Sequence, residues 1–295
     1  MKKIALTALM LTSTSAFATS TRVASHQGNI GLADDTDYTN FSSLTDDAGN
    51  NAWFDYDGTN LGGAATFDGS GVSFAQADDR VNFSWNHSLN GDAGYRVDAD
   101  IASTEALRVG GSYGMSSGGI DSDMGASVDM NGDAMGFGAH YWARKLTDSD
   151  VAGYGVMANY SDVGTDLNGG YLMGSVWGGD ASKAALTYGP TLGVSLPDGG
   201  DMALTPALET NLAGEVTVKD WIGVRGSVAA SLDIVDPTGE FDVATSMSTG
   251  FGASINTDSV NIDLMVSPDA ILGGPHFLTG AGTGPAAAFS ARFDI

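Results

Sequence analysis

Charged residues recur at alternating positions inside otherwise apolar segments of this sequence. Because alternate residues of a β-strand point to the same face, arginines and aspartates with this spacing would line one water-facing surface. If that surface encloses a pore, opposed charges set a transverse field that selects solutes by charge and size. Salt-bridged struts that fill a narrow interior are the alternative, and the sequence favours neither. The candidate residues are Arg96, Asp98, Asp100, Arg108, Arg225, Asp233, Asp263 and Arg292.

One short motif suggests an enzyme. Residues 110–114, Gly-Gly-Ser-Tyr-Gly, match the G-x-S-x-G pattern that presents a nucleophilic serine in hydrolases. That elbow joins a strand to a helix, and no helical periodicity follows it here. His140 shares the parity of the polar residues, but no Ser or Asp stands beside it in a pattern typical of nucleophilic catalysis. We therefore predict that the protein is not an enzyme and that Ser112 is a strand residue on the polar face.

A second motif suggests a metal site. Asp129, Asn131 and Asp133 place oxygen atoms at alternate positions, as the start of a calcium-binding loop does. Ala134 stands where such a loop needs a glycine for its sharp turn, and no glutamate closes the motif. We predict a hairpin turn and no cofactor, with calcium held by these three residues as the alternative. The absence of cysteine excludes disulfides, Cys-ligated metals and a Cys nucleophile.

From about Arg80 onward, the charged positions lie in segments that alternate apolar with polar or small residues. The segments run about 9 to 12 residues, the length that crosses a bilayer at a tilt of about 45°, and Asp, Asn and Gly clusters separate them. The sequence therefore predicts a transmembrane antiparallel β-barrel, with a soluble β-sandwich or barrel as the alternative. Aromatic residues near segment ends are predicted to form interfacial girdles; they include Trp53, Tyr56, Tyr95, Tyr141, Tyr160, Trp177 and Trp221.

The strand count follows from the same alternation. It gives thirteen strands between Val81 and Ile295, and one or two more from residues 51–58 and 61–68. Because bacterial single-chain barrels have even counts, we predict an all-β up-and-down barrel of about 14 strands over residues 49–295, with 12 or 16 as alternatives. Residues 19–48 are polar and weakly periodic, and we predict a short N-terminal arm or a plug inside the barrel. Residues 267–285, rich in Gly and Pro, are predicted to form a long loop.

The N-terminus has the features of an export signal. Residues 1–18 combine Lys2 and Lys3, an apolar stretch and a small-x-small cleavage site at Ala16-Phe17-Ala18, which predicts a cleaved signal peptide. The chain carries 12 Lys and Arg against 36 Asp and Glu, for a net charge of −24. Such an acidic chain is a poor partner for nucleic acid, whose phosphates require a basic face.

The last segment carries a resemblance to a known class. Apolar residues occupy positions 287, 289, 291, 293 and 295. In this the chain resembles the outer-membrane β-barrel proteins of Gram-negative bacteria, in which the barrel-insertion machinery reads the terminal strand. The resemblance assigns that signal to Phe289, Phe293 and Ile295, although the family usually ends in Phe or Trp. Residues 32–35, 40–44 and 220–226 also look like parts of long-chain fatty-acid-transporter barrels, which implies an N-terminal plug in the lumen.

Together these features predict a porin-like channel in the outer membrane of a Gram-negative bacterium, for passive diffusion of small hydrophilic solutes. A preference for cations is expected because the net field is negative. A plugged transporter of hydrophobic ligands and a non-transporting structural barrel are the alternatives. The expected partners are outer-membrane lipid and lipopolysaccharide, the insertion machinery and small solutes; the oligomeric state is left open.

Overall fold

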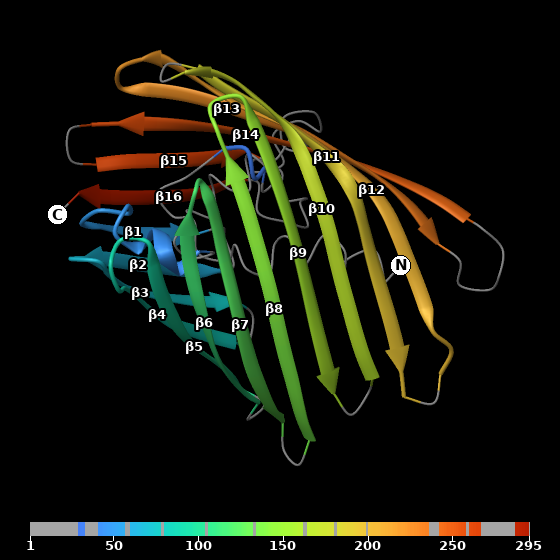
Figure 1. Ribbon diagram of the computed structural model, residues 1–295. Helices are drawn as coiled ribbons and strands as arrows, with labels where there is room; N and C mark the ends of the chain where they lie inside the picture. The colour runs from blue at the N-terminus through green and yellow to red at the C-terminus, as the bar shows by residue number, and fades with distance from the viewer. Residues whose placement is uncertain are drawn as a thin grey trace, which may run out of the picture.

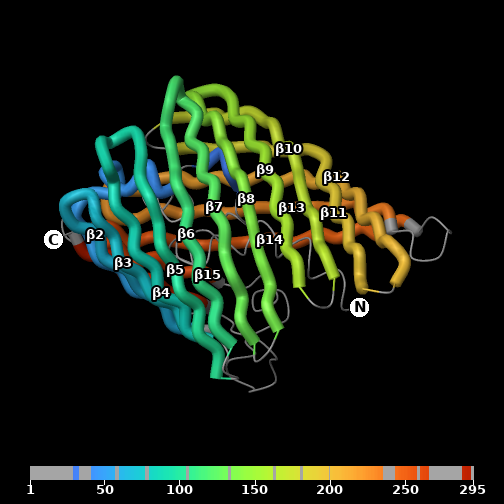
Figure 2. Tube along the Cα trace, turned by 60° about the horizontal axis from the view of Figure 1, so that its bottom comes forward, coloured from blue at the N-terminus to red at the C-terminus, as the bar shows by residue number. Residues whose placement is uncertain are grey.

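Sixteen antiparallel strands close into one barrel in the computed structural model of the protein (Figure 1). Each strand pairs with its neighbours in the chain, and β1 pairs with β16 to close the sheet (Figure 2). The up-and-down barrel is confirmed, with sixteen strands instead of fourteen. The structure describes residues 29–32, 41–56, 60–77, 80–103, 106–131, 134–161, 164–179, 182–198, 200–235, 242–257, 260–266 and 287–294.

A 3₁₀ turn, η2 (Ser42–Thr45), precedes the barrel. No helix long and apolar enough to cross a bilayer occurs among the described residues. The strands are β1 (Asn51–Tyr56), β2 (Leu61–Phe67), β3 (Ser70–Ala77), β4 (Arg80–Ser88), β5 (Ala93–Ala102), β6 (Leu107–Ser117), β7 (Ile120–Asn131), β8 (Ala134–Leu146), β9 (Asp150–Ser161), β10 (Gly164–Gly179), β11 (Ser182–Pro197), β12 (Ala203–Lys219), β13 (Ile222–Val235), β14 (Asp242–Asn256), β15 (Val260–Val266) and β16 (Ala287–Asp294).

The strand that the sequence count missed is β3. Phe67 of β2 pairs with Ser70 of β3 across the two-residue turn Asp68-Gly69. Asp68 has φ 47° and Gly69 has φ 69°, as a type I′ hairpin turn requires at both central positions. Asp-Gly is a strong hairpin signal for this reason, but the small residues in this part of the chain obscure the alternation on either side of it.

The wall of the barrel is uneven in height. β1, β2, β3, β15 and β16 have six to eight residues, whereas β10, β11 and β12 have sixteen or seventeen (Figure 1). We call the end where β1 begins and β16 finishes the turn end, because short connections such as 68–69, 118–119 and 220–221 lie there. The opposite end is the loop end: it has the two longest connections, 236–241 and 267–286, although its connections 78–79, 132–133 and 162–163 are also short.

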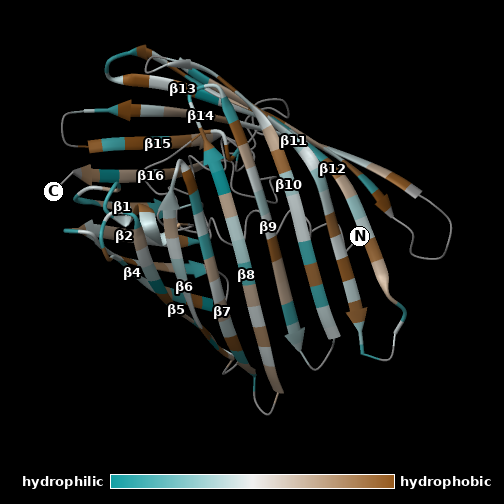
Figure 3. Cartoon of the chain, viewed as in Figure 1, coloured by the Kyte–Doolittle hydropathy of each residue, from teal (hydrophilic) through white to brown (hydrophobic). Residues whose placement is uncertain are grey.

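The two faces of the wall have opposite character, as the alternating colours along the strands show (Figure 3). On β13, Val224 and Val228 are each 44% exposed on the outer face, while Arg225 between them points inward and is buried. Trp177 on β10 is likewise exposed on the outer face, and Trp221 is exposed in the turn between β12 and β13. The girdle prediction is wrong for Trp53, which has the inward parity of β1 and packs against residues of the N-terminal segment.

Candidate functional site: the lumen and the segment docked in it

All eight predicted lumen residues lie on the inward face of the barrel, on five different strands. Arg96, Asp98 and Asp100 are on β5, and Arg108 is on β6. The other four occupy a distant part of the wall: Arg225 and Asp233 on β13, Asp263 on β15 and Arg292 on β16. Arg225 is near the turn end and Asp233 near the loop end of one strand, so the eight residues do not form a single ring.

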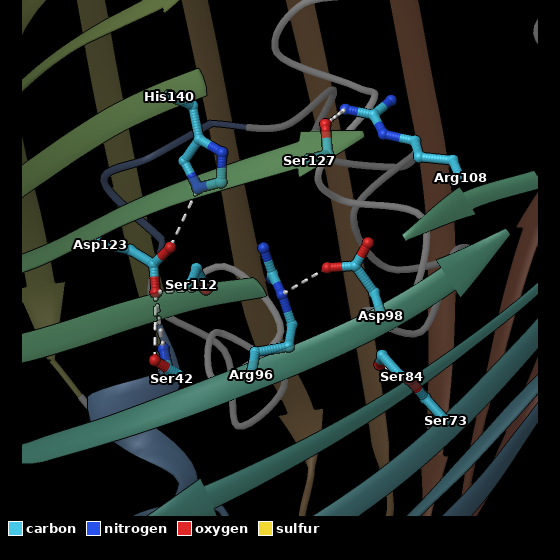
Figure 4. Close-up of polar contacts among 10 residues, drawn as sticks. All are labelled: Ser42, Ser73, Ser84, Arg96, Asp98, Arg108, Ser112, Asp123, Ser127 and His140. Atoms are coloured by element: carbon cyan, nitrogen blue, oxygen red, sulfur yellow. Dashed lines mark hydrogen bonds and ion pairs between the residues drawn. The ribbon is translucent and has the colours of Figure 1, made fainter. Parts of the chain in front are cut away.

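Neighbouring charges on the β4–β7 wall pair with one another (Figure 4). Arg96 Nε lies 3.8 Å from Asp98 Oδ1 on the same strand, and Arg108 Nε lies 3.8 Å from Asp129 Oδ1 across the β6–β7 pair. Arg108 Nη2 also donates to Ser127 Oγ at 2.9 Å. Because each of these cations has its carboxylate on the same stretch of wall, the charges here act as struts along the wall.

The opposite part of the wall holds the most buried ion pair. Arg225 Nη1 lies 2.7 Å from Asp263 Oδ1, and the two side chains are 3% and 10% exposed. The pair spans β13 and β15 across the small residues Gly252 and Ser254 of β14. Arg225 Nε and Nη2 have no hydrogen-bond partner among the described residues. Asp263 is therefore the main compensation for a buried guanidinium.

Glycines on the inward face let large side chains lie flat against the wall. A Cβ at Gly110 would come within 2.7 Å of Asp98 Oδ2, and a Cβ at Gly155 would overlap the indole of Trp142. The His140 ring stacks on that indole, with ring centroids 5.7 Å apart. Long inward side chains thus pack into glycine hollows of the adjacent strand instead of projecting across the lumen.

The site has a centre that the sequence did not indicate, the carboxylate of Asp123 on β7. Its side chain is fully buried, and His140 Nε2 donates to Oδ1 at 3.1 Å. Ser112 Oγ donates to Oδ2, also at 3.1 Å (Figure 4). A nucleophilic triad places the imidazole between the hydroxyl and the carboxylate. Here the carboxylate lies between the other two groups, so the arrangement is a hydrogen-bonded strut and not a triad.

The 3₁₀ turn η2 docks on this centre from inside the barrel. Ser42 Oγ donates to Asp123 Oδ2 at 3.1 Å, and the turn packs on the inner face of β4 to β7 (Figure 4). The ring of Phe41 lies 4.9 Å from the Arg144 guanidinium, close enough for a cation–π contact. Past the turn, Ala48 packs against Trp53 of β1.

A second piece of the N-terminal segment contacts another wall. Asn29 Nδ2 donates to the carbonyl oxygens of Ala185 on β11 at 3.1 Å and of Asn211 on β12 at 3.0 Å. Leu32 joins a small apolar cluster with Val151, Val176, Ala185 and Ala213 on the inner faces of β9 to β12. In a ring of sixteen strands, β12 is nearly opposite β5, so the segment contacts both sides of the lumen near the turn end.

The remaining predicted residues are less informative. Asp129 is paired with Arg108, Asn131 ends β7 and Asp133 lies outside the described residues. Within the described part of the chain, no cluster of three His, Cys, Asp or Glu side chains could hold a metal ion. Phe289 and Phe293 are exposed on the outer face of β16. Ile295, residues 1–28 with the predicted signal peptide, and the predicted loop at 267–285 lie outside the described residues.

No protein-family model matches the chain, and no curated protein matches it. The fold is similar to a structure described as a bacterial polysaccharide outer membrane secretin, with a TM-score of 0.50 and 11% identity over 83% of this chain and 96% of the other. BamA from Haemophilus ducreyi has a TM-score of 0.45 and 10% identity over 82% and 69% of the two chains. OmpT, an outer membrane protein of Vibrio cholerae, has a TM-score of 0.45 and 8% identity over 82% and 96%. The closed sixteen-stranded sheet, apolar outside and polar inside, is the fold of the outer-membrane β-barrels.

Proposed function

We propose that the protein is an outer-membrane channel for passive diffusion of small hydrophilic solutes. The observation that supports this most directly is the lumen: it is enclosed by sixteen strands and lined by paired charges, hydroxyls and glycines. Barrels with this number of strands leave room for an aqueous channel. Several of the inward charges are paired along the wall, so a solute in the lumen would meet a polar surface.

We further propose a preference for cations. Among the described strand residues, inward-facing carboxylates outnumber inward-facing cations, so the field inside is negative. The carboxylates are Asp55, Asp98, Asp100, Asp121, Asp123, Asp129, Asp166, Glu209, Glu215, Asp233 and Asp263, and the cations are Arg80, Arg96, Arg108, Arg144, Lys183, Arg225 and Arg292.

The placement in the membrane follows from the connections. Outer-membrane barrels have short periplasmic turns and longer extracellular loops, so we assign the turn end to the periplasm. The docked N-terminal segment then lies at the periplasmic mouth. In this orientation the apolar outer face contacts outer-membrane lipid, with lipopolysaccharide around the loop end, and the barrel-insertion machinery is the assembly partner.

The test is conductance of the purified full chain in a planar bilayer with a salt gradient. We expect steady current steps and a reversal potential that indicates cation selectivity. Glu209 and Asp233 occupy diagonal inward positions on β12 and β13, and Glu209→Gln with Asp233→Asn should move the reversal potential toward zero. Asp148→Asn, in the exposed turn between β8 and β9, is the matched control. Anion selectivity of the unaltered protein would contradict the proposal.

A second candidate function, a plugged transporter of hydrophobic ligands, is favoured by one observation. The N-terminal segment contacts both sides of the lumen and seats Leu32 in an apolar cluster of the wall. For this candidate, the folded full chain would be silent in a bilayer, and deletion of residues 19–48 would produce conductance. Current steps from the full chain would instead favour the diffusion channel.

A further inference from the structure

We propose that the 3₁₀ turn Ser42–Thr45 is a gate at the turn end of the lumen, closed when the turn docks on the β4–β7 wall and open when it leaves. The proposal rests on the proposed channel function. Two features of the wall decide between the two states. The carboxylate of Asp123 holds the turn, and Gly94 and Gly114 leave space for it.

The Asp123 carboxylate accepts hydrogen bonds both from the turn and from the wall, so it stays hydrogen-bonded when the turn leaves. Its Oδ2 accepts hydrogen bonds from the backbone N–H of Ser42 at 3.4 Å and from Ser42 Oγ at 3.1 Å. The wall itself supplies Ser112 Oγ to Oδ2 and His140 Nε2 to Oδ1, each at 3.1 Å. When the turn leaves, the carboxylate keeps both wall partners. The open state therefore has no unpaired buried charge, which would otherwise make it inaccessible.

The docked state is also incompletely satisfied. Ser43 Oγ in the turn and both amide atoms of Asn86, on the β4 wall that the turn packs against, are buried with no hydrogen-bond partner among the described residues. Buried polar groups without partners are costly, and most are paired in native proteins. Undocking exposes these atoms to water in the lumen. The free energy of docking therefore includes an unfavourable contribution from these unpaired polar atoms, which favours the open state.

Two glycines form the cradle that the turn occupies. A Cβ at Gly94 would overlap the carbonyl oxygen of Ser42, and a Cβ at Gly114 would come within 2.8 Å of the backbone nitrogen of Ser43. Neither glycine has a left-handed φ. A Cβ at Gly94 would also come within 3.0 Å of the backbone oxygen of His87 in the wall, whereas the three atoms nearest to a Cβ at Gly114 all belong to the turn. A single methyl group at Gly114 therefore excludes the turn, and none of its three nearest atoms belongs to Asp123 or to the wall.

The first experiment inserts this methyl group. Single-channel recordings of the full chain with Gly114→Ala should show loss of the low-conductance closed level and a persistent open level. Gly62→Ala is the matched control, because it adds a methyl to the inner face of β2 where the nearest atom is 3.6 Å away. Ser42→Ala should favour the open state less strongly than the added methyl group does. It removes one hydrogen bond to a charged group and should raise the open-to-closed ratio about tenfold.

The second experiment holds the gate closed. Ser88 Oγ donates to Asp46 Oδ2 at 2.7 Å, so Asp46→Cys with Ser88→Cys links the residue after the turn to the end of β4. The natural chain has no cysteine, so these are the only thiols. The oxidised variant should remain at the closed level, and reduction should restore transitions.

The outcomes separate the gate from the channel. If the unaltered protein conducts but Gly114→Ala, Ser42→Ala and the oxidised cysteine pair all give the same current levels and open-to-closed ratio as the unaltered protein, the gate is refuted and the channel remains. If no variant conducts, although each migrates as a folded barrel on a gel without boiling, both proposals fail. Higher open levels from the alanine variants together with a disulfide-locked closed level support the gate.

Discussion

An arginine at the middle of the outer face of β13 should destabilise the barrel in proportion to its depth in the bilayer. Val224 and Val228 point outward from the same strand and are each 44% exposed, so the two sites differ in depth and not in packing. Ala229, next to Val228, points into the lumen and offers a control for adding arginine to this strand.

The magnitude follows from strand geometry. β13 begins at Ile222, so Val224 is two residues and Val228 six residues along it. With a rise of about 3.4 Å per residue and a tilt of about 45°, Val224 lies about 5 Å and Val228 about 14 Å from the turn end, measured along the membrane normal. The apolar band is about 25 Å tall, which places Val228 near its centre. We expect Val228→Arg to cost about 2–4 kcal/mol and Val224→Arg about 0–1 kcal/mol.

The assay is reversible unfolding by urea in phospholipid vesicles, followed by tryptophan fluorescence and by the gel mobility of the folded barrel. Ala229→Arg should stay close to the unaltered protein, because its guanidinium reaches water in the lumen. The order of stability should be Ala229→Arg, then Val224→Arg, then Val228→Arg. If Val228→Arg were as stable as Ala229→Arg, lipid would not cover this face and the membrane assignment would be wrong.

Two further predictions concern charge and turn chemistry, and the same unfolding assay measures both. Arg225→Met leaves the buried Asp263 carboxylate without its partner and should cost about 3–5 kcal/mol, most of which the added Asp263→Leu should recover. If the double variant remained as unstable as Arg225→Met, the unpaired Asp263 carboxylate would not be the cause of the lost stability. Gly118→Ala places a Cβ on a residue with φ 61°, with no atom beyond the adjacent residues within 4 Å of that Cβ, and should cost about 1–2 kcal/mol. Gly118→Asn should cost less, because asparagine tolerates that conformation; equal losses would argue against backbone strain.

Alternation predicted the face of most strand residues, because parity is a local property of the chain. On β13 it assigned Val224 to the outside and Arg225 to the lumen, and both assignments hold. It was less reliable where strands are short or made of small residues. β3 was missed for this reason. Trp53 was assigned to a girdle because it lies near a segment end, whereas it has the inward parity of β1 and packs against the N-terminal segment.

The Asp123 centre shows what parity cannot supply. Ser42, Ser112, Asp123 and His140 come from four separate elements and meet only through the register of β6, β7 and β8. Each residue alone is an ordinary polar residue of a strand or turn. A one-residue change of register would separate them, so the contact is a property of the closed sheet and not of any one segment.

The uneven wall has a consequence for the surrounding bilayer. Strands of six to eight residues, such as β1 to β3, rise only about 14–19 Å at a tilt of about 45°, less than the apolar band of about 25 Å. Strands of sixteen or seventeen residues on the far side exceed it. A membrane of uniform thickness cannot match both sides, so acyl chains beside β1 to β3 must compress or the barrel must lean. Lipids with shorter acyl chains would relieve this mismatch and should therefore be enriched next to β1 to β3.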